Sequence, residues 1–336
     1  MSPRPDPQEI ETVLLGGEAL YTREEAVRRA GARPEFSARI WRALGFTTRD
    51  DDEPAFTESD VEALRITSRL LEEDILDEEA AVRMARAMGQ TMARLAEWQT
   101  SILTTLSYTP ETSTDEAGIS PLVDLAKDLL PDIERLLLHI WRRQLAASSA
   151  RTLAVMQNSD DAAPTYFPLV VGFADLVSFT TLSRELDEVE LAEVVEGFEA
   201  TAADIVASGG GRLIKTLGDE VLYVSNSAQG AAEIALQLAD GVKTHVEVPD
   251  VRVGLAYGPV LALLGDVFGT TVNRSSRLTS FARPGTVLVD DALADQLRDD
   301  PSFQVVAARA RHAHGLGQLQ PYALRRSFEG SQPAGG

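Results

Sequence analysis

Two aspartates occupy positions where their carboxylates could bind a metal ion. Asp175 lies in the apolar run 170–177, which reads as a buried strand, and Asp219 follows Gly218 in a short turn. A carboxylate at a buried strand end is costly unless a cation or hydrogen-bond donors meet it. Two such groups on adjacent strands would suit Mg²⁺, which takes one or two carboxylates plus substrate phosphates. For either residue alone, a strand end, a helix cap or an ordinary turn is an equally good explanation.

A second pair of residues could bind a nucleotide. Asn273 and Arg277 are four positions apart in a helical stretch that follows the segment 265–269, so they share one helix face. An amide and a guanidinium on one face could hold a ribose and a phosphoryl group. For an isolated pair, a solvated surface helix is the simpler interpretation.

The elements that must position these residues alternate between strands and helices. Strand-like apolar runs cover residues 169–177, 212–214, 221–224, 251–257 and 286–289, and helical stretches cover 188–207, 229–243 and 272–281. The turn at 217–220 is too short for a crossover helix, so it joins two strands directly. A hairpin within a β-α-β-β-α-β order predicts a ferredoxin-like α+β sheet.

The front half of the chain has a different pattern, which predicts an all-α domain. We expect a flexible segment over 1–20, a helical domain over 21–121, a long helix and linker over 122–164, the α+β domain over 165–326 and a disordered tail over 327–336. Pro131 stands near a restart of the long helix. Thr57 is a plausible N-cap for the helix that follows it, because an acidic first turn comes next.

A methionine stripe marks one face of this helical domain. Met84, Met88, Met92 and Leu95 recur at helical spacing. Core packing is the favoured interpretation. The alternative is an adaptable pocket for a hydrophobic ligand, since methionine side chains are pliant.

Composition excludes several classes of function. The formal charge is −21, which opposes binding to nucleic acid or to an anionic membrane surface. No cysteine is present, so thiolate catalysis and zinc–cysteine sites are excluded. No window approaches eighteen consecutive apolar residues, and the acidic, proline-rich start does not resemble a signal peptide. We therefore expect a cytoplasmic protein that does not enter membranes.

The stretch from about residue 168 to 324 resembles the catalytic domain of class III nucleotidyl cyclases, especially the soluble mycobacterial and actinobacterial adenylate cyclases. Three motifs carry the resemblance, in the family's order and at similar spacing. They are Phe173-Ala174-Asp175-Leu176-Val177-Ser178-Phe179-Thr180, Ile214-Lys215-Thr216-Leu217-Gly218-Asp219, and Asp266-Val267-Phe268-Gly269 with Val272-Asn273-Arg274-Ser275-Ser276-Arg277.

The resemblance implies a role for each matched residue. It makes Asp175 and Asp219 the ligands of two Mg²⁺ or Mn²⁺ ions, and it assigns Lys215 and Asp266 to adenine recognition. Asn273 would orient the ribose, and Arg277 would stabilise charge on the α-phosphate. The backbone after Asp175 would help to hold the triphosphate, at Leu176, Phe179 and Thr180.

The family resemblance also implies a homodimer. Each active site of the family combines the metal aspartates of one subunit with the purine and transition-state residues of the other, and this chain carries all six. One departure concerns the terminal phosphates, where the family often has a lysine. Arg311 or His314 could take that place here. A role for His314 would make activity depend on pH near neutrality.

Residues 21–62 resemble a winged helix-turn-helix of the MerR type. Seven arginines against three glutamates in 21–49 are offset by seven acids in 50–62, so a regulatory or dimer-forming domain is favoured over DNA binding. Its signal is not readable, although a small or hydrophobic effector would suit it. The alternatives for the whole protein are a guanylate cyclase, a diguanylate cyclase, and a non-catalytic nucleotide sensor or DNA-binding regulator.

Overall fold

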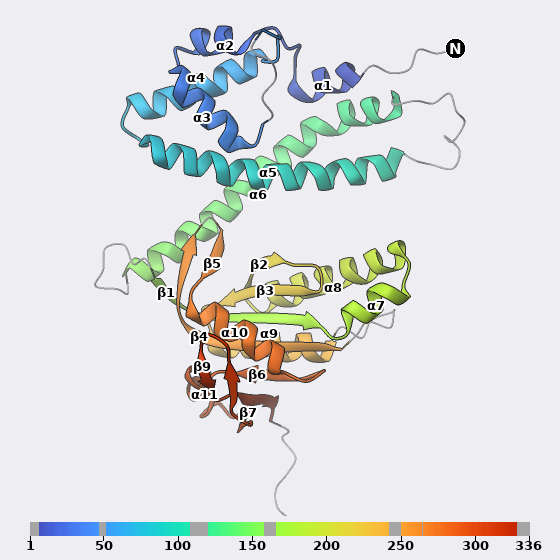
Figure 1. Cartoon of the computed structure of the whole chain (residues 1–336), viewed down its shortest axis with the longest axis vertical. Coiled ribbons are helices and arrows are strands. Elements are labelled where there is room, and N and C mark those ends of the chain that lie inside the picture. The colour runs from blue at the N-terminus through green and yellow to red at the C-terminus, as the bar shows by residue number, and fades with distance from the viewer. Residues whose placement is uncertain are drawn as a thin grey trace, which may run out of the picture. The chain divides into compact units, whose positions relative to one another are not determined.

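The chain divides into two units, Met1–Arg151 and Thr152–Gly336 (Figure 1). A computed structural model describes residues 7–46, 52–107, 120–157, 166–241, 250–263 and 265–327. The expected linker at 158–164 and the expected tail beyond Ser327 lie outside these residues, as does most of the expected break at 107–121. No described helix combines the length and the apolarity needed to cross a membrane.

The described part of the first unit is helical. Its helices are α1 (Pro7–Leu15), α2 (Arg23–Ala30), α3 (Pro34–Leu44), α4 (Glu58–Glu72), α5 (Glu78–Ser107) and α6 (Ser120–Gln157). Capping boxes begin α2 at Thr22 and α4 at Thr57, which confirms the predicted cap at Thr57. Helix α6 runs through Pro131 without a break.

Two expectations for this unit are wrong. Residues 7–15 were expected in a flexible segment but form α1, because Pro7 suits a first helical position and apolar residues then recur at helical spacing. The methionine stripe is not core: Met84, Met88 and Met92 are 42%, 48% and 51% exposed. The buried face of α5 is the neighbouring row of small residues Ala81, Ala85 and Gly89.

Gly89 shows why the small-residue face of α5 is the buried one. A Cβ at this position would lie 2.3 Å from the backbone oxygen of Leu44. The backbones of α3 and α5 therefore approach more closely than larger side chains would allow. The methionines, one position earlier in each turn, are directed away from that contact.

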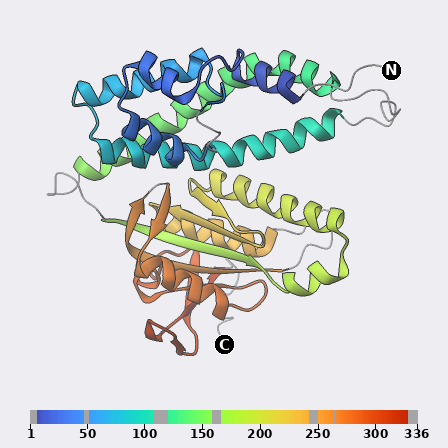
Figure 2. The same cartoon turned by 45° about the horizontal axis from the view of Figure 1, so that its top comes forward.

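The second unit is built on one sheet with the strand order β2-β3-β1-β4-β6-β10-β7, and β5 pairs with β4 (Figure 2). The strands of this sheet are β1 (Tyr166–Leu176), β2 (Arg212–Thr216), β3 (Glu220–Ser225), β4 (Val251–Leu263), β5 (Asp266–Phe268), β6 (Val287–Val289), β7 (Phe303–Ala307) and β10 (Tyr322–Arg326). A separate hairpin joins β8 (Arg311–Ala313) to β9 (Gly317–Leu319). The helices are α7 (Phe179–Glu185), α8 (Glu188–Ser208), α9 (Ala228–Gly241), α10 (Thr270–Phe281) and α11 (Asp291–Leu297).

The predicted ferredoxin-like arrangement is confirmed. Strand β1 pairs antiparallel with both β3 and β4, and β2 pairs antiparallel with β3 through the turn at 217–219. Strands β5 and β7–β10 and helices α7 and α11 were not predicted. Each of these elements is three to seven residues long, too short to establish a period in the sequence.

Cores lie on both faces of this sheet. Helices α8, α9 and α11 pack on one face around Val170, Ala174 and Tyr223. Side chains alternate along β1, so Val171 and Phe173 point to the other face, where α10 lies against β1 and β4. Asp175 shares the face of Val171 and Phe173.

Candidate active site

A row of charged side chains crosses three adjacent strands where β1 ends. Asp175 on β1 lies opposite Glu220 on β3 and opposite Arg252 on β4. Residues paired in this way have neighbouring side chains on one face. The Arg252 guanidinium meets the carboxylate, with Nε 2.6 Å and Nη2 2.5 Å from Asp175 Oδ2.

The acidic groups of this row are short of positive charge. Burial raises the pKa of Asp175, Arg252 lowers it, and the nearby Asp219 raises it. Burial also raises the pKa of Glu220 to about 7, and the charges of Asp175 and Asp219 add to that rise. A bound cation would relieve both effects, so the residues present fit a metal ion.

Such an ion would need ligands from the substrate. Within the described ranges, no group of three or more histidine, aspartate or glutamate side chains could hold a metal. Two carboxylates with open positions for phosphate oxygens suit Mg²⁺, which keeps water and substrate ligands.

The turn that carries Asp219 is tied to the end of β1. Gly218 has φ 72°, a left-handed conformation that glycine adopts without strain. The amide of Leu176 donates to the carbonyl oxygen of Asp219 at 2.9 Å, which brings Asp219 beside Asp175. Because its amide is already used, Leu176 does not fit the predicted role of holding a phosphate.

The other two predicted phosphate-binding amides lie where α7 begins. Phe179 is the first residue of α7 and Thr180 the second, and Ser178 before them is left-handed with φ 64°. The first amides of a helix have no partner within it. The intrahelical bonds to the carbonyl of Ser178 begin only at Thr181 and Leu182.

Lys215 and Asp266 come together although 51 positions separate them. Lys215 Nζ lies 2.5 Å from Asp266 Oδ2, and both side chains are partly exposed. Strand β2 supplies the lysine and β5 supplies the aspartate. Asp266 Oδ1 also accepts from the amide of Val267 at 2.8 Å, which fixes the carboxylate plane.

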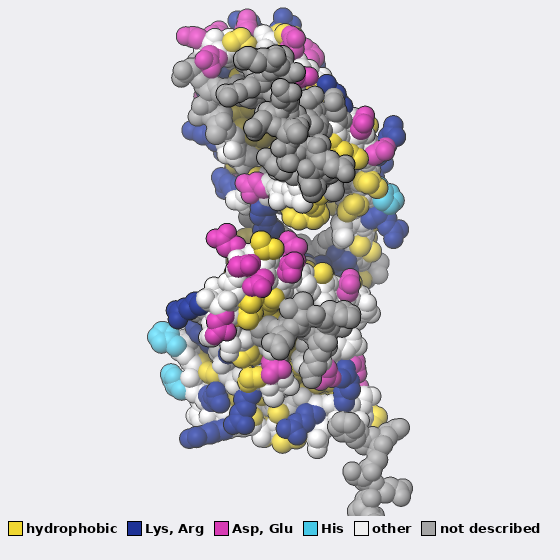
Figure 3. Space-filling view, turned by 90° about the vertical axis from the view of Figure 1, so that its right-hand side faces the viewer, with side chains coloured by type: hydrophobic (Ala, Val, Ile, Leu, Met, Phe, Trp, Pro, Cys, Tyr) yellow, Lys and Arg dark blue, Asp and Glu magenta, His cyan; other side chains and the backbone are white. Residues whose placement is uncertain are grey.

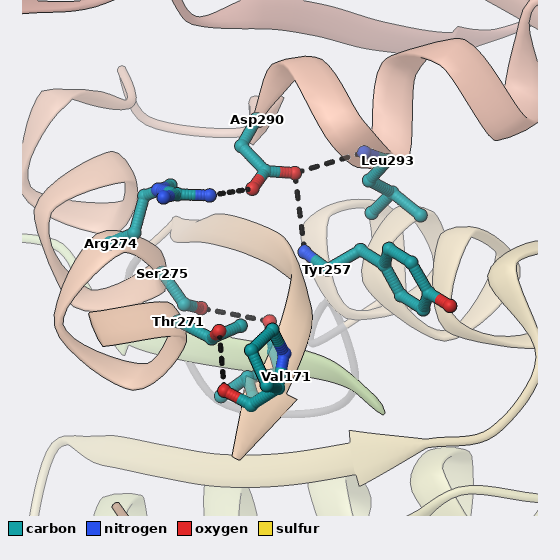
Figure 4. Close-up of polar contacts among 8 residues, drawn as sticks. Val171, Tyr257, Thr271, Arg274, Ser275, Asp290 and Leu293 are labelled. Atoms are coloured by element: carbon teal, nitrogen blue, oxygen red, sulfur yellow. Dashed lines mark hydrogen bonds and ion pairs between the residues drawn. The ribbon is translucent and has the colours of Figure 1, made fainter. Parts of the chain in front are cut away.

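Asn273 and Arg277 lie on the exposed face of α10. The opposite face of this helix is anchored to the sheet by hydroxyl groups (Figure 4). Ser275 Oγ lies 2.9 Å from the carbonyl oxygens of both Val171 and Gly254, so its one proton is shared between them. Thr271 Oγ1 donates to the carbonyl oxygen of Pro259 at 2.8 Å. These contacts hold α10 at a fixed distance from the sheet, with Asn273 and Arg277 on its outer face.

Arg311 and His314 have different surroundings. Arg311 on β8 stacks over Phe281, with Cζ 5.3 Å from the ring centroid. Phe281 is four residues after Arg277, so Arg311 stands at the end of the face that carries Asn273 and Arg277. His314 is exposed in the β8–β9 turn.

Helix α8 carries a cluster of acidic side chains on its exposed surface. Figure 3 shows acidic side chains gathered on the side of the unit where α8 lies. Four exposed glutamates contribute to this surface: Glu188, Glu190, Glu193 and Glu196. The cationic groups among the candidate residues are Lys215 on β2, Arg252 on β4, Arg277 on α10 and Arg311 on β8.

Sequence reasoning missed the partners of the predicted residues. Arg252 and Glu220 could not be recognised as neighbours of Asp175 from the sequence, because strand register and not sequence spacing brings them there. Arg274 lies inside the motif at 266–277, yet its partner Asp290 is 16 positions away. The one available signal was a charged residue at the end of an apolar strand, which is present at both Arg252 and Asp290.

Comparison with known proteins identifies the family. Residues 162–326 match the family described as Adenylate and Guanylate cyclase catalytic domain. An adenylate cyclase of Streptomyces coelicolor is 44% identical over 97% of this chain and 91% of its own length. An adenylate cyclase of Streptomyces griseus is 46% identical over 88% of this chain and 74% of its own length.

Among solved structures, the catalytic core of a rhodopsin-guanylyl cyclase with converted specificity, in complex with ATPαS, aligns at 25% identity and a TM-score of 0.45. The alignment covers 48% of this chain and 98% of that one. From the sequence matches, the chain belongs to the class III nucleotidyl cyclases, among the actinobacterial adenylate cyclases.

Proposed function

We propose that this protein converts ATP to 3′,5′-cyclic AMP and pyrophosphate, in active sites shared between two subunits. The observation that carries the choice of base is the pairing of Lys215 with Asp266 at 2.5 Å. The substrate's 3′-hydroxyl attacks the α-phosphorus, and the bond between that phosphorus and the oxygen bridging to the β-phosphate breaks. The departing group is pyrophosphate.

Lys215 and Asp266 together suit adenine. The ammonium donates to adenine N1, and the carboxylate accepts from the exocyclic amine. Guanine presents an N–H donor and a carbonyl acceptor at the matching positions, so both contacts would be reversed. Each mismatch would leave a polar group of the site unpaired, which is how sites of this kind reject an analogue.

Asp175 and Asp219 would hold two Mg²⁺ or Mn²⁺ ions. When bound, such ions activate the attacking hydroxyl and neutralise charge on the phosphates. Arg252 supports this assignment, because its guanidinium already provides a positive charge at Asp175. When a metal ion binds the carboxylate of Asp175, the guanidinium of Arg252 would be released from it. Arg252 would then contact the triphosphate, alongside the amides of Phe179 and Thr180.

Asn273 would orient the ribose and Arg277 would stabilise the charge that develops on the α-phosphate. Arg311 is the better supported of the two terminal-phosphate candidates, since it stands at the end of the same face, whereas His314 lies in a turn. In the proposed homodimer this face would meet the aspartates of the partner subunit.

The test is direct incubation of the purified chain with ATP or GTP, with Mg²⁺ or Mn²⁺ in turn. We expect cyclic AMP from ATP with at least one metal, and little cyclic GMP. No cyclic AMP with either metal would favour a nucleotide sensor. Faster turnover of GTP than of ATP would overturn the assignment of Lys215 and Asp266.

We also propose that residues 21–121 form a regulatory domain, coupled to the catalytic domain through residues 122–164. The exposed row of Met84, Met88 and Met92 offers a pliant apolar surface for a hydrophobic effector. Replacing Met88 with glutamine should leave basal activity unchanged and weaken the response to any hydrophobic compound that alters it. An undiminished response would show that the methionine row does not bind the effector.

A further inference from the structure

A partly buried ion pair contacts helix α10 from its side. Arg274 Nη1 lies 2.9 Å from Asp290 Oδ2, and Asp290 is only 2% exposed (Figure 4). The other carboxylate oxygen accepts from the amides of Leu293 at 3.0 Å and Tyr257 at 3.2 Å. Asp290 thus joins α10 to β4 and to the start of α11.

Capping α11 does not require a charged residue here. One oxygen of Asp290 makes both backbone contacts, and asparagine caps helices about as well as aspartate. Burial raises the pKa of Asp290, and the contact with Arg274 opposes that rise. Because an ion pair around a buried carboxylate gives little net stability over apolar packing, a role in selecting one arrangement of the chain is the alternative.

The hydrogen bonds between α10 and the sheet fix the distance between them. They constrain the rotation of α10 about its own axis less closely. Thr271, Ser275 and Thr279 recur every four residues, so their hydroxyls follow one stripe of the helix. Gly254 allows close approach: a Cβ there would lie 2.2 Å from the amide nitrogen of Thr279. Leu278 and Val272 pack on either side of this stripe, but apolar contacts are non-directional, so they constrain the rotation of α10 less sharply than a hydrogen-bonded ion pair does.

Arg274 lies where it can prevent that rotation. At 3.6 residues per turn it stands about 60–100° around the helix from Asn273 and Arg277, and about 60–140° from the three hydroxyl residues on the other side. A rotation of about 10° moves an atom about 5 Å from the axis by about 0.9 Å. A misplacement of about 1 Å can cost about a hundredfold in rate.

We propose that Arg274 and Asp290 are positioning residues, which set the rotation of α10 and thereby aim Asn273 and Arg277 at the ribose and the α-phosphate. This inference rests on the proposed function of that face. Neither member of the pair contacts substrate, so their loss lowers kcat far more than it raises the KM for ATP.

The test compares Arg274→Met, Asp290→Asn and the double variant with wild type in the full chain. Cyclic AMP formation by wild type is measured first, so a wrong substrate assignment shows itself before any variant is made. We expect each variant to lose at least tenfold in kcat with KM changed less than threefold. The double variant loses no more than the worse single variant, and Arg274→Lys recovers part of the rate.

Arg326→Met is the matched control. Arg326 on β10 pairs with Glu233 and Asp240 on α9, so its removal breaks ion pairs of the same unit away from α10. Assays are run below the melting temperature of every variant. If Arg274→Met loses at least five times more kcat than Arg326→Met, the positioning role stands. A smaller difference overturns it and makes the pair merely structural. The double variant, which leaves no buried unpaired charge, decides the question if a single variant fails to fold.

Discussion

At the scale of single residues, the proposed metal site rests on a charge imbalance. Asp175, Glu220 and the nearby Asp219 supply three acidic groups, against the one guanidinium of Arg252 that contacts Asp175. Metal ions proposed for this site would complete their coordination with the substrate's phosphates. Together with Lys215 and Arg252, such ions would outweigh at short range the field of a chain of charge −21.

Lys215→Met should lower kcat/KM for ATP by about 10- to 150-fold, the value of one charged hydrogen bond of about 1.5–3 kcal/mol. Preference for ATP over GTP should fall with it. Initial rates of cyclic AMP formation measure the effect. Lys127→Met is the control, since Lys127 is an exposed lysine of the helical unit, 3.6 Å from Glu9. A loss below threefold for Lys215→Met would contradict its role in base recognition.

At the scale of elements, the sheet and α10 fit together through small residues and hydroxyls. Gly254 on β4 lies directly beneath Ser275 and Thr279. The helix can therefore pack directly against the strand backbone. Its hydroxyl groups then donate to strand carbonyl oxygens that have a lone pair to spare. This contact sets the distance between the sheet and the face of α10 that carries Asn273 and Arg277.

Gly254→Ala should lower the free energy of unfolding of the second unit by about 2 kcal/mol or more, because the new Cβ meets helix backbone that cannot yield. Activity should fall with it as α10 is displaced. Thermal unfolding followed by circular dichroism measures the change, with a fall in Tm of several degrees expected.

Gly197→Ala provides the matched control. Gly197 lies in α8 with no atom within 4 Å of an added Cβ, so alanine should stabilise the helix by about 1 kcal/mol. Equal melting temperatures for the two variants would mean that the close contact at Gly254 does not constrain α10.

At the scale of the whole molecule, the positive charge of the first unit bears on whether it could bind DNA. The arginines of the helix-turn-helix-like region are largely engaged: Arg33 and Arg39 pair with Glu78, Arg28 pairs with Glu24, and Arg29 stacks on Tyr21. These contacts pair part of the positive charge that DNA could meet, and the low expectation of DNA binding stays a prediction.

The proposed sharing of sites between subunits predicts complementation. Asp175→Ala and Arg277→Ala should each be nearly inactive alone. After mixing and exchange of subunits, each heterodimer keeps one intact site, so activity should return to about a quarter of wild type. A cyclic AMP assay on the mixture measures the recovery. No recovery, with exchange demonstrated by tagged subunits, would show that the sites are not shared.

The sequence by itself determined which chemical groups the chain carries and the order of its elements. The motif around Lys215 and Asp219, the aspartate at the end of β1 and the Asn273–Arg277 spacing were all readable, because each depends on local residues. The β-α-β-β-α-β order followed from periods long enough to recognise.

Only the tertiary structure decided the partners of these groups. Register across β1, β3 and β4 brings Arg252 and Glu220 to Asp175, and the packing of α10 brings Arg274 to Asp290. The choice of buried face on α5 was also tertiary, since the close approach of α3 selects small residues over methionines. In each case the deciding contact joins residues far apart in sequence, so no local pattern records it.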